Sequence, residues 1–287
     1  MKSYLALAWK ELKAQKITAI LILVAVIMST IMTTVIGQSI GMLQSMRIQQ
    51  AAGLNGNRYA TFHQLGKEQA QKLHEDDRLY DVGDTIFIGS TPLGNSSLSL
   101  YLREYHDNAL SMYPAIGNVK EGRLPEEAME IALSEDALQY LGLDAVIGGT
   151  VSLDLSVSVM DGSLPELEYS ADFVLTGILE SSYIGYASGT VEGIVGEGTA
   201  EELLPEEYLL YSTDFKTYDK QNFQSIIYAL AEDLNVDERY IQYNWVLLDA
   251  IGISYDEAAD SDTGTGFSFM TAACILVGVL VLLAAGW

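Results

Sequence analysis

Three histidines and a short acidic run are the first residues in this 287-residue sequence that could do chemistry. His74 opens the run HEDD at residues 74–77, and a zinc-binding helix would need a second histidine one turn away. His63 and His106 are too far along the chain to supply it locally. We therefore expect the three histidines to be scattered on the surface and predict no metal-binding residue.

Other catalytic patterns are also missing from the sequence. There is no G-x-S-x-G motif for a nucleophilic serine, and the single cysteine, Cys274, lies in an apolar run. DSDTG at residues 260–264 resembles the start of a calcium loop, but Gly264 stands where an acidic ligand is needed. A solvated linker is the better interpretation of that segment.

Nucleotide chemistry is not encoded either, because the sequence has neither a P-loop motif nor a G-x-G-x-x-G after a strand. We nominate no catalytic, cofactor-binding or metal-binding residue and predict that the protein is not an enzyme. A membrane-anchored enzyme stays open only through carboxylates that folding alone would bring together.

Two uncharged apolar runs, residues 17–36 and 267–287, predict membrane spans. At 1.5 Å per residue the second run is about 31 Å long, which matches a hydrocarbon core of about 30 Å. The polar side chains of the first run are Ser and Thr, which can hydrogen-bond to their own helix. This run is longer than the core of a signal peptide and has no nearby cleavage site, so we expect an uncleaved anchor.

The charges divide sharply along the chain. Residues 37–266 hold 11 of the 15 Lys and Arg residues but 38 of the 39 Asp and Glu residues, whereas four lysines precede the first span. The positive-inside rule then places the N-terminus in the cytoplasm and residues 39–266 outside. An acidic domain excludes nucleic-acid binding. Its charge serves either solubility, which we favour, or attraction of cationic ligands.

The periodicity of the outer region predicts an α+β domain. Residues 37–52 continue the first span as a helical stalk that GLNGN at 53–57 ends. Ser134 and Gly142 should cap a helix, and Asp219 should begin another over 219–234. We expect a loop at 188–206. Strands are predicted at 58–63, 79–90, 97–105, 150–159 and 171–180, and a further helix at 67–75.

One stretch carries a family resemblance: NVKEGRLPEEAMEIALSEDALQYLGLDAVIGGTVSLD, residues 118–154. A G-R-L-P turn precedes an E-I-A-L strand, a helix ending in L-G, and I-G-G-T before a further strand. ADFVLTGILES follows about twenty residues later, with a central glycine. This order resembles the extracellular core domain of FtsX-like and MacB-like ABC transporter permeases. The basic start AWKELKAQK, running into the first span, is similar to these permeases as well.

The resemblance implies a permease subunit that couples a separate cytoplasmic ATPase to an extracellular domain, for export or mechanotransmission. The ATP would be bound by the partner, and the permease would dimerise or pair with a sister permease in the cell membrane. The resemblance implies an outer domain that acts on lipoproteins, peptides or cell-wall enzymes, and the acidic charge adds cationic antimicrobial peptides to the possible ligands. The rival interpretation is a two-span receptor or surface-binding protein without an ATPase.

The predicted order of segments follows from these arguments. Since permeases of this family continue through further spans, we also expect the chain to be a fragment cut at the inner face of its second span. The segments are a cytoplasmic amphipathic helix (1–16), transmembrane helix 1 (17–38), a stalk helix and hinge (39–57), a MacB-like core domain (58–255), a linker (256–266) and transmembrane helix 2 (267–287).

Overall fold

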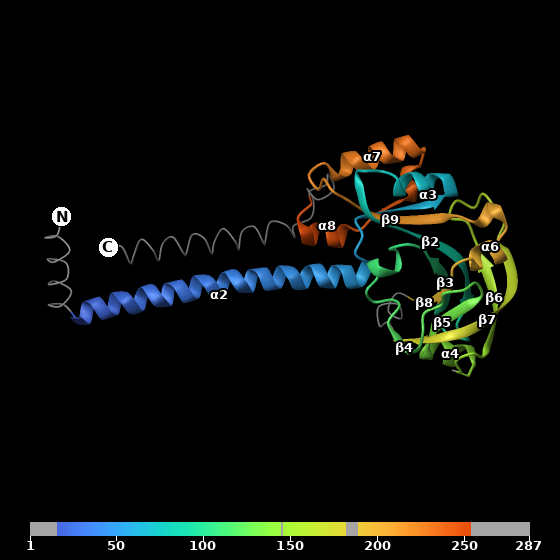
Figure 1. Cartoon of the computed structure of the whole chain (residues 1–287), viewed down its shortest axis with the longest axis horizontal. Coiled ribbons are helices and arrows are strands. Elements are labelled where there is room, and N and C mark those ends of the chain that lie inside the picture. The colour runs from blue at the N-terminus through green and yellow to red at the C-terminus, as the bar shows by residue number, and fades with distance from the viewer. Residues whose placement is uncertain (1–15, 145, 182–188, 254–287) are drawn as a thin grey trace. The chain divides into compact units, whose positions relative to one another are not determined.

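The computed structural model of the chain describes residues 16–144, 146–181 and 189–253 (Figure 1). Residues 16–47 belong to one unit and residues 48–253 to another. The predicted N-terminal helix at 1–16, the linker at 256–266 and the second span at 267–287 lie outside the described residues, apart from Lys16.

The elements follow one another as a long helix and then a mixed α/β domain. The strands are β1 (Ala60–Leu65), β2 (Leu79–Pro92), β3 (Ser99–Tyr105), β4 (Val119–Gly122), β5 (Glu130–Ser134), β6 (Thr150–Val157), β7 (Leu167–Leu179), β8 (Thr190–Val195), β9 (Tyr211–Thr217) and β10 (Ile241–Tyr243). The α-helices are α2 (Lys16–Asn55), α3 (Lys67–His74), α4 (Glu135–Leu141), α6 (Thr199–Leu203), α7 (Phe223–Leu234) and α8 (Trp245–Ile251).

Helix α2 is one continuous helix of 40 residues. Its large apolar side chains between Ile17 and Ile36 are exposed, so the helix is not a buried core helix. As predicted, its hydroxyl groups return to the backbone one turn back: Thr30 Oγ1 donates to Val26 O at 2.8 Å and Ser39 Oγ to Val35 O at 2.8 Å. Among the described residues it is the one helix long and apolar enough to cross a membrane.

Six strands of the domain form a closed ring. The sheet runs β10-β1-β9-β2-β3-β8-β5-β7-β4, and β6 pairs with both β7 and β2, which joins the two sides. Pairs β3–β8 and β5–β7 are parallel, whereas the other pairs are antiparallel. Alternate side chains of the ring form one buried cluster that includes Ile88, Leu102, Leu133, Leu153 and Phe173.

Strand β2 is 14 residues long, and only its second half belongs to the ring. Its first half pairs with β9, and β1 and β10 extend the sheet from there. Helices α3, α7 and α8 contribute to a second buried cluster with this sheet, in which Phe62 and Phe215 meet edge-to-face at 5.2 Å between ring centroids. Ala51, near the end of α2, is buried in the same cluster.

Most local predictions are confirmed by the structure. Ser134 Oγ accepts a hydrogen bond from Ala137 N at the start of α4, and Gly142 ends that helix in the left-handed region at φ 70°. The predicted helix at 37–52 is part of α2, and the GLNGN segment ends it at Asn55. The α+β class is also confirmed.

Two predictions are wrong. The segment 188–206 is not a loop: it contains β8, which lies between β3 and β5, and α6. Its glycines and glutamates are typical of a loop, but β8 is buried by β3 and β5, which are distant in the sequence. Asp219 does not begin the next helix either, because it accepts hydrogen bonds from Gln221 N and Asn222 N in a preceding turn and α7 starts at Phe223.

Candidate functional site

A cavity of about 450 Å³ lies over the polar face of the central sheet. The strands that build it alternate, so the side chains opposite the apolar clusters are polar. On β1, Thr61 and His63 face the cavity while Phe62 points into the second cluster. On β3, Arg103 and Tyr105 line the cavity, and on β9 Ser212 and Asp214 do so.

The end of α2 forms part of the wall of this cavity. Residues 53–56 line it together with Tyr113, whose loop accepts a hydrogen bond from Asn57 N at Met112 O. Gly56 has φ 82°, and a Cβ there would lie 2.7 Å from a ring carbon of Tyr113. Asn244 Nδ2 donates to Gly56 O at 2.7 Å. The helix end is therefore held beside the cavity by hydrogen bonds with Met112 and Asn244.

A buried ion pair lies on the cavity floor. Arg58 Nε is 3.2 Å from Asp214 Oδ1, and the side chains are 8% and 1% exposed. Asp214 also accepts from Thr61 Oγ1 at 2.5 Å and Tyr113 Oη at 2.7 Å. Burial raises the pKa of Asp214, and Arg58 and the two hydroxyls oppose that shift. All the oxygens of this carboxylate are thus already used.

Arg58 is less completely satisfied than its partner. Its Nε donates to Tyr113 Oη at 3.0 Å and its Nη2 to Gln242 Oε1 at 3.1 Å. Its Nη1 is enclosed and has no acceptor among the described residues. An unmet buried donor of this kind costs about 1–3 kcal/mol. It therefore marks a place where water or a ligand oxygen belongs.

A second ion pair, Arg103 with Glu192, joins β3 to β8 along the cavity. Arg103 Nε donates to Glu192 Oε2 at 3.0 Å, and the side chains are 29% and 23% exposed. Neither Nη1 nor Nη2 of Arg103 meets an acceptor in the described part of the chain. Both terminal nitrogens can therefore bind an added acceptor.

His63 completes the polar floor. Its ring nitrogens contact Ser212 Oγ at 2.9 Å and Gln242 Oε1 at 3.2 Å. Burial lowers the pKa of His63, so the imidazole is held neutral at pH 7. Two arginines of the cavity are paired with Asp214 and Glu192, a third carboxylate, Glu180, lines the cavity and is exposed, and the histidine contributes no charge.

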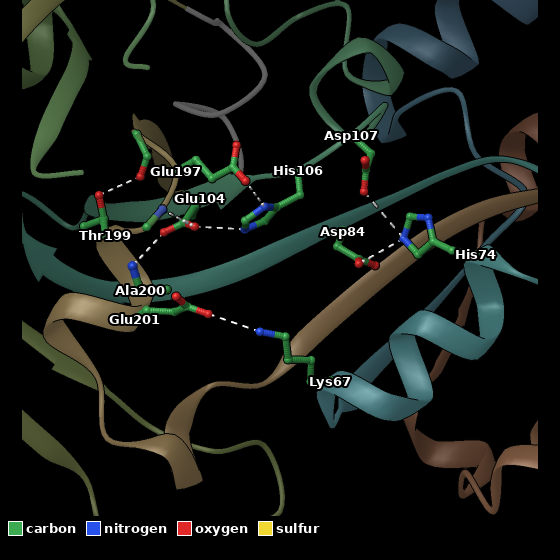
Figure 2. Close-up of polar contacts among 12 residues, drawn as sticks. Lys67, His74, Asp84, Glu104, His106, Asp107, Glu197, Thr199, Ala200 and Glu201 are labelled. Atoms are coloured by element: carbon green, nitrogen blue, oxygen red, sulfur yellow. Dashed lines mark hydrogen bonds and ion pairs between the residues drawn. The ribbon is translucent and has the colours of Figure 1, made fainter. Parts of the chain in front are cut away.

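Asp84 precedes the cavity-lining Thr85 on β2, so its side chain lies on the other face of the sheet, where it belongs to a histidine–carboxylate cluster (Figure 2). His74 of α3 places Nε2 at 3.0 Å from Asp84 Oδ2 and 3.8 Å from Asp107 Oδ2. Asp84 Oδ1 also accepts a hydrogen bond from Thr213 Oγ1 at 2.6 Å, which holds the carboxylate in place. The hydrogen bond to Asp84 raises the pKa of His74. The three ligand atoms lie within 4.8 Å of one another and could hold a metal ion. A protonated His74, however, compensates the charge of the two carboxylates without any metal.

His106 lies in a related arrangement beside this cluster (Figure 2). Its Nε2 is 2.9 Å from Glu104 Oε1, and its Nδ1 is 3.5 Å from Glu197. Glu104 is buried and also accepts from Gly198 N at 2.9 Å and Ala200 N at 2.6 Å, where α6 begins. Contact with Glu104 raises the pKa of His106. This cluster fastens α6 to β3.

The prediction of scattered surface histidines is therefore wrong. His63 and His106 are partly buried, the side chain of His74 is 27% exposed, and His74 and His106 each contact carboxylates. The sequence nominated no site residue, so the cavity was missed altogether. Its only local signal was the alternation of polar and apolar residues on β1, β3 and β9, which also describes any strand with one solvated face.

Comparison with known proteins gives similarities of fold. No protein-family model and no curated protein matches the chain. The extracellular domain of the noncanonic ABC-type transporter YknZ from Gram-positive bacteria matches with a TM-score of 0.43 and 12% identity over 65% of this chain and 99% of that one. The periplasmic region of MacB from Actinobacillus actinomycetemcomitans matches with a TM-score of 0.40 and 15% identity over 71% and 96%.

Proposed function

We propose that this protein is the permease subunit of an ABC transporter, in which a separate cytoplasmic ATPase drives an extracellular domain. The continuity of α2 carries the proposal. One helix begins at Lys16, includes the apolar run 17–36 and ends at Asn55 on the wall of the cavity. In this proposal an axial shift or rotation of the span is transmitted along this one helix to the outer domain.

The residues that carry the family resemblance support the same assignment. The G-R-L-P turn follows β4, E-I-A-L is β5, the capped helix is α4, and I-G-G-T leads into β6. Gly177 is the central glycine of β7, and a Cβ there would lie 2.3 Å from Arg123 O in the G-R-L-P turn. The motif residues therefore pack against one another, which gives a physical reason for their occurring together.

The partners follow from this assignment. A cytoplasmic ATPase supplies ATP binding and hydrolysis, and the permease pairs with a second copy or a sister subunit in the cell membrane. Residues 39–266 lie outside, and the chain has no catalytic role of its own. The substrate is a lipoprotein or a peptide, including cationic antimicrobial peptides, and the action is export or mechanotransmission.

A second candidate is a two-span receptor without an ATPase. The observation in its favour is the cavity, since a receptor needs a ligand site in its outer domain. The receptor uses α2 as an anchor only, whereas the permease uses it to transmit motion.

Affinity purification from the native membrane separates the two candidates. The natural full-length protein, tagged at its N-terminus and extracted in mild detergent, should carry an ABC ATPase subunit in a fixed ratio. A matched control replaces Lys10 and Lys13 with Glu, which disturbs the predicted cytoplasmic helix at 1–16 and should weaken the association. Recovery of the protein without any ATPase, under conditions that retain other membrane complexes, would contradict the permease.

A further inference from the structure

We propose that the cavity binds a small amphiphilic ligand that carries a carboxylate group, held by the terminal nitrogens of Arg103. The ligand's apolar part lies against the side wall of the cavity. This binding needs neither an ATPase nor a second subunit, because all the residues involved belong to the unit formed by residues 48–253.

Two arginines of the cavity hold N–H groups that meet no acceptor among the described residues. Arg103 uses only Nε for Glu192, which leaves two parallel N–H groups whose geometry fits a carboxylate bidentately. Arg58 adds the enclosed Nη1, which lacks an acceptor among the described residues. Asp214, in contrast, already accepts from Thr61, Tyr113 and Arg58. A ligand that brings acceptor oxygens satisfies this site better than a cation does.

The remaining wall of the cavity is apolar, so the part of the ligand that contacts it should be apolar as well. Ile116, Leu179 and Val191 line the cavity, with the rings of Tyr105 and Tyr113 near them. The volume of about 450 Å³ lies in the range of small-molecule sites, roughly 300–1,000 Å³. A ligand the size of a capped amino acid or a short peptide fits, with its carboxylate toward Arg103 and its side chain against this wall.

The overall charge of the protein sets a limit on the ligand. The formal net charge of −24 repels multiply charged anions from the surface. Within the cavity, however, Arg58 and Arg103 pair with Asp214 and Glu192, and the third lining carboxylate, Glu180, is exposed to solvent. A single carboxylate on an apolar body is therefore favoured over a polyanion.

Titration of the full 287-residue chain in detergent micelles, without any ATPase, tests the proposal. The probes are N-acetyl-leucine and N-acetyl-leucinamide, which have nearly the same size but differ in the carboxylate. Isothermal titration calorimetry should give a Kd on the order of 1 mM for the acid, as expected of a fragment of this size. The amide should bind at least about tenfold more weakly, since it cannot form the charged bidentate contact.

Three variants assign the effect to the cavity. Arg103→Gln should abolish the preference for the acid, whereas Arg239→Gln, which removes an exposed arginine paired with Asp237, should leave it unchanged. Ile116→Trp should fill the cavity and block both probes. Thermal unfolding of each variant confirms that it is folded.

Three results would overturn the proposal: equal binding of acid and amide, no binding of either up to about 20 mM, or an unchanged preference in Arg103→Gln. Absence of binding would assign the unmet donor of Arg58 to water. None of these results bears on the permease assignment, because the ATPase is absent from the experiment.

Discussion

The Arg58–Asp214 pair predicts a specific pattern of stability loss. Arg58→Met removes the cation while leaving Asp214, which is 1% exposed, with hydrogen bonds from Thr61 and Tyr113 only. Breaking a buried pair from one side costs about 3–5 kcal/mol. That is a large part of the 5–15 kcal/mol, roughly, that stabilises a typical domain. With a urea slope of about 2–3 kcal/mol/M, the midpoint should fall by about 1–2 M.

The double variant separates the pair from its surroundings. Arg58→Met with Asp214→Asn leaves no uncompensated charge, so its loss should be smaller than the sum of the two single losses. The expected coupling lies within about 0.5–3 kcal/mol. Both side chains hydrogen-bond to Tyr113, so this comparison removes most of the packing effect that the two variants share.

The loss in Arg58→Met should also depend on pH. Burial already raises the pKa of Asp214, and removing the guanidinium raises it further. A carboxyl group whose pKa is higher in the folded state stabilises the fold below its unfolded pKa of about 3.9. That stability is lost as the pH rises through the folded value. The penalty of the variant should therefore be larger at pH 8 than at pH 5.

Trp245 fluorescence provides the assay, because Trp245 is stacked on Tyr243 at 4.4 Å between ring centroids. Replacing Trp9 and Trp287 with Phe leaves it as the only tryptophan of the chain. Urea unfolding in detergent micelles then gives the free energy of unfolding for each variant. Strictly additive losses, within about 0.3–0.5 kcal/mol, would refute the argument that the two side chains stabilise each other.

Three further predictions use the same unfolding assay. The contribution of His74 and His106 should be complete below pH 6.5 and should decline as the pH rises through their raised pKa values, and His74→Gln should flatten this dependence. Gly177→Ala should cost at least about 1 kcal/mol, because its Cβ would lie 2.3 Å from a carbonyl oxygen, whereas Gly53→Ala in α2, where no atom lies within 4 Å of the added Cβ, should not destabilise the protein. Phe215→Ala should cost about 3–5 kcal/mol, since the ring is fully buried, and a loss below about 1 kcal/mol would contradict its place in the core.

Local chemistry made much of the fold predictable. Ser134 and Gly142 act on their own backbone, and the alternation at residues 150–159 reports one buried face, so neither depends on distant partners. Strand β8 could not be found in this way. Its sequence TVEGIV holds a glycine and a glutamate, and its burial comes from β3 and β5, which lie about 60–90 residues earlier.

The site was less predictable than the fold. The cavity takes residues from β1, β3, β8, β9 and β10, whose order in the sheet differs from their order in the chain. Arg58 and Asp214 form an ion pair although they are 156 residues apart in the sequence. His74 and Asp84 are only ten residues apart, but a helix and a strand must pack before they meet. Spacing alone carries no information about such contacts.

Coupling through α2 is the central claim, and an ATP-dependent labelling measurement tests it most directly. The natural full-length permease is purified with its ATPase, Cys274 is replaced by Ser, and one cysteine is introduced at Ala115 on the cavity wall. We expect ATP to change the rate at which this cysteine reacts with a maleimide. A Gly-Gly insertion after Ser45 should abolish that change while ATP hydrolysis continues, because it breaks the helix between span and domain. A matched insertion after Asp161, in an exposed loop, should preserve it. An unchanged ATP response with the insertion after Ser45 would contradict transmission along α2.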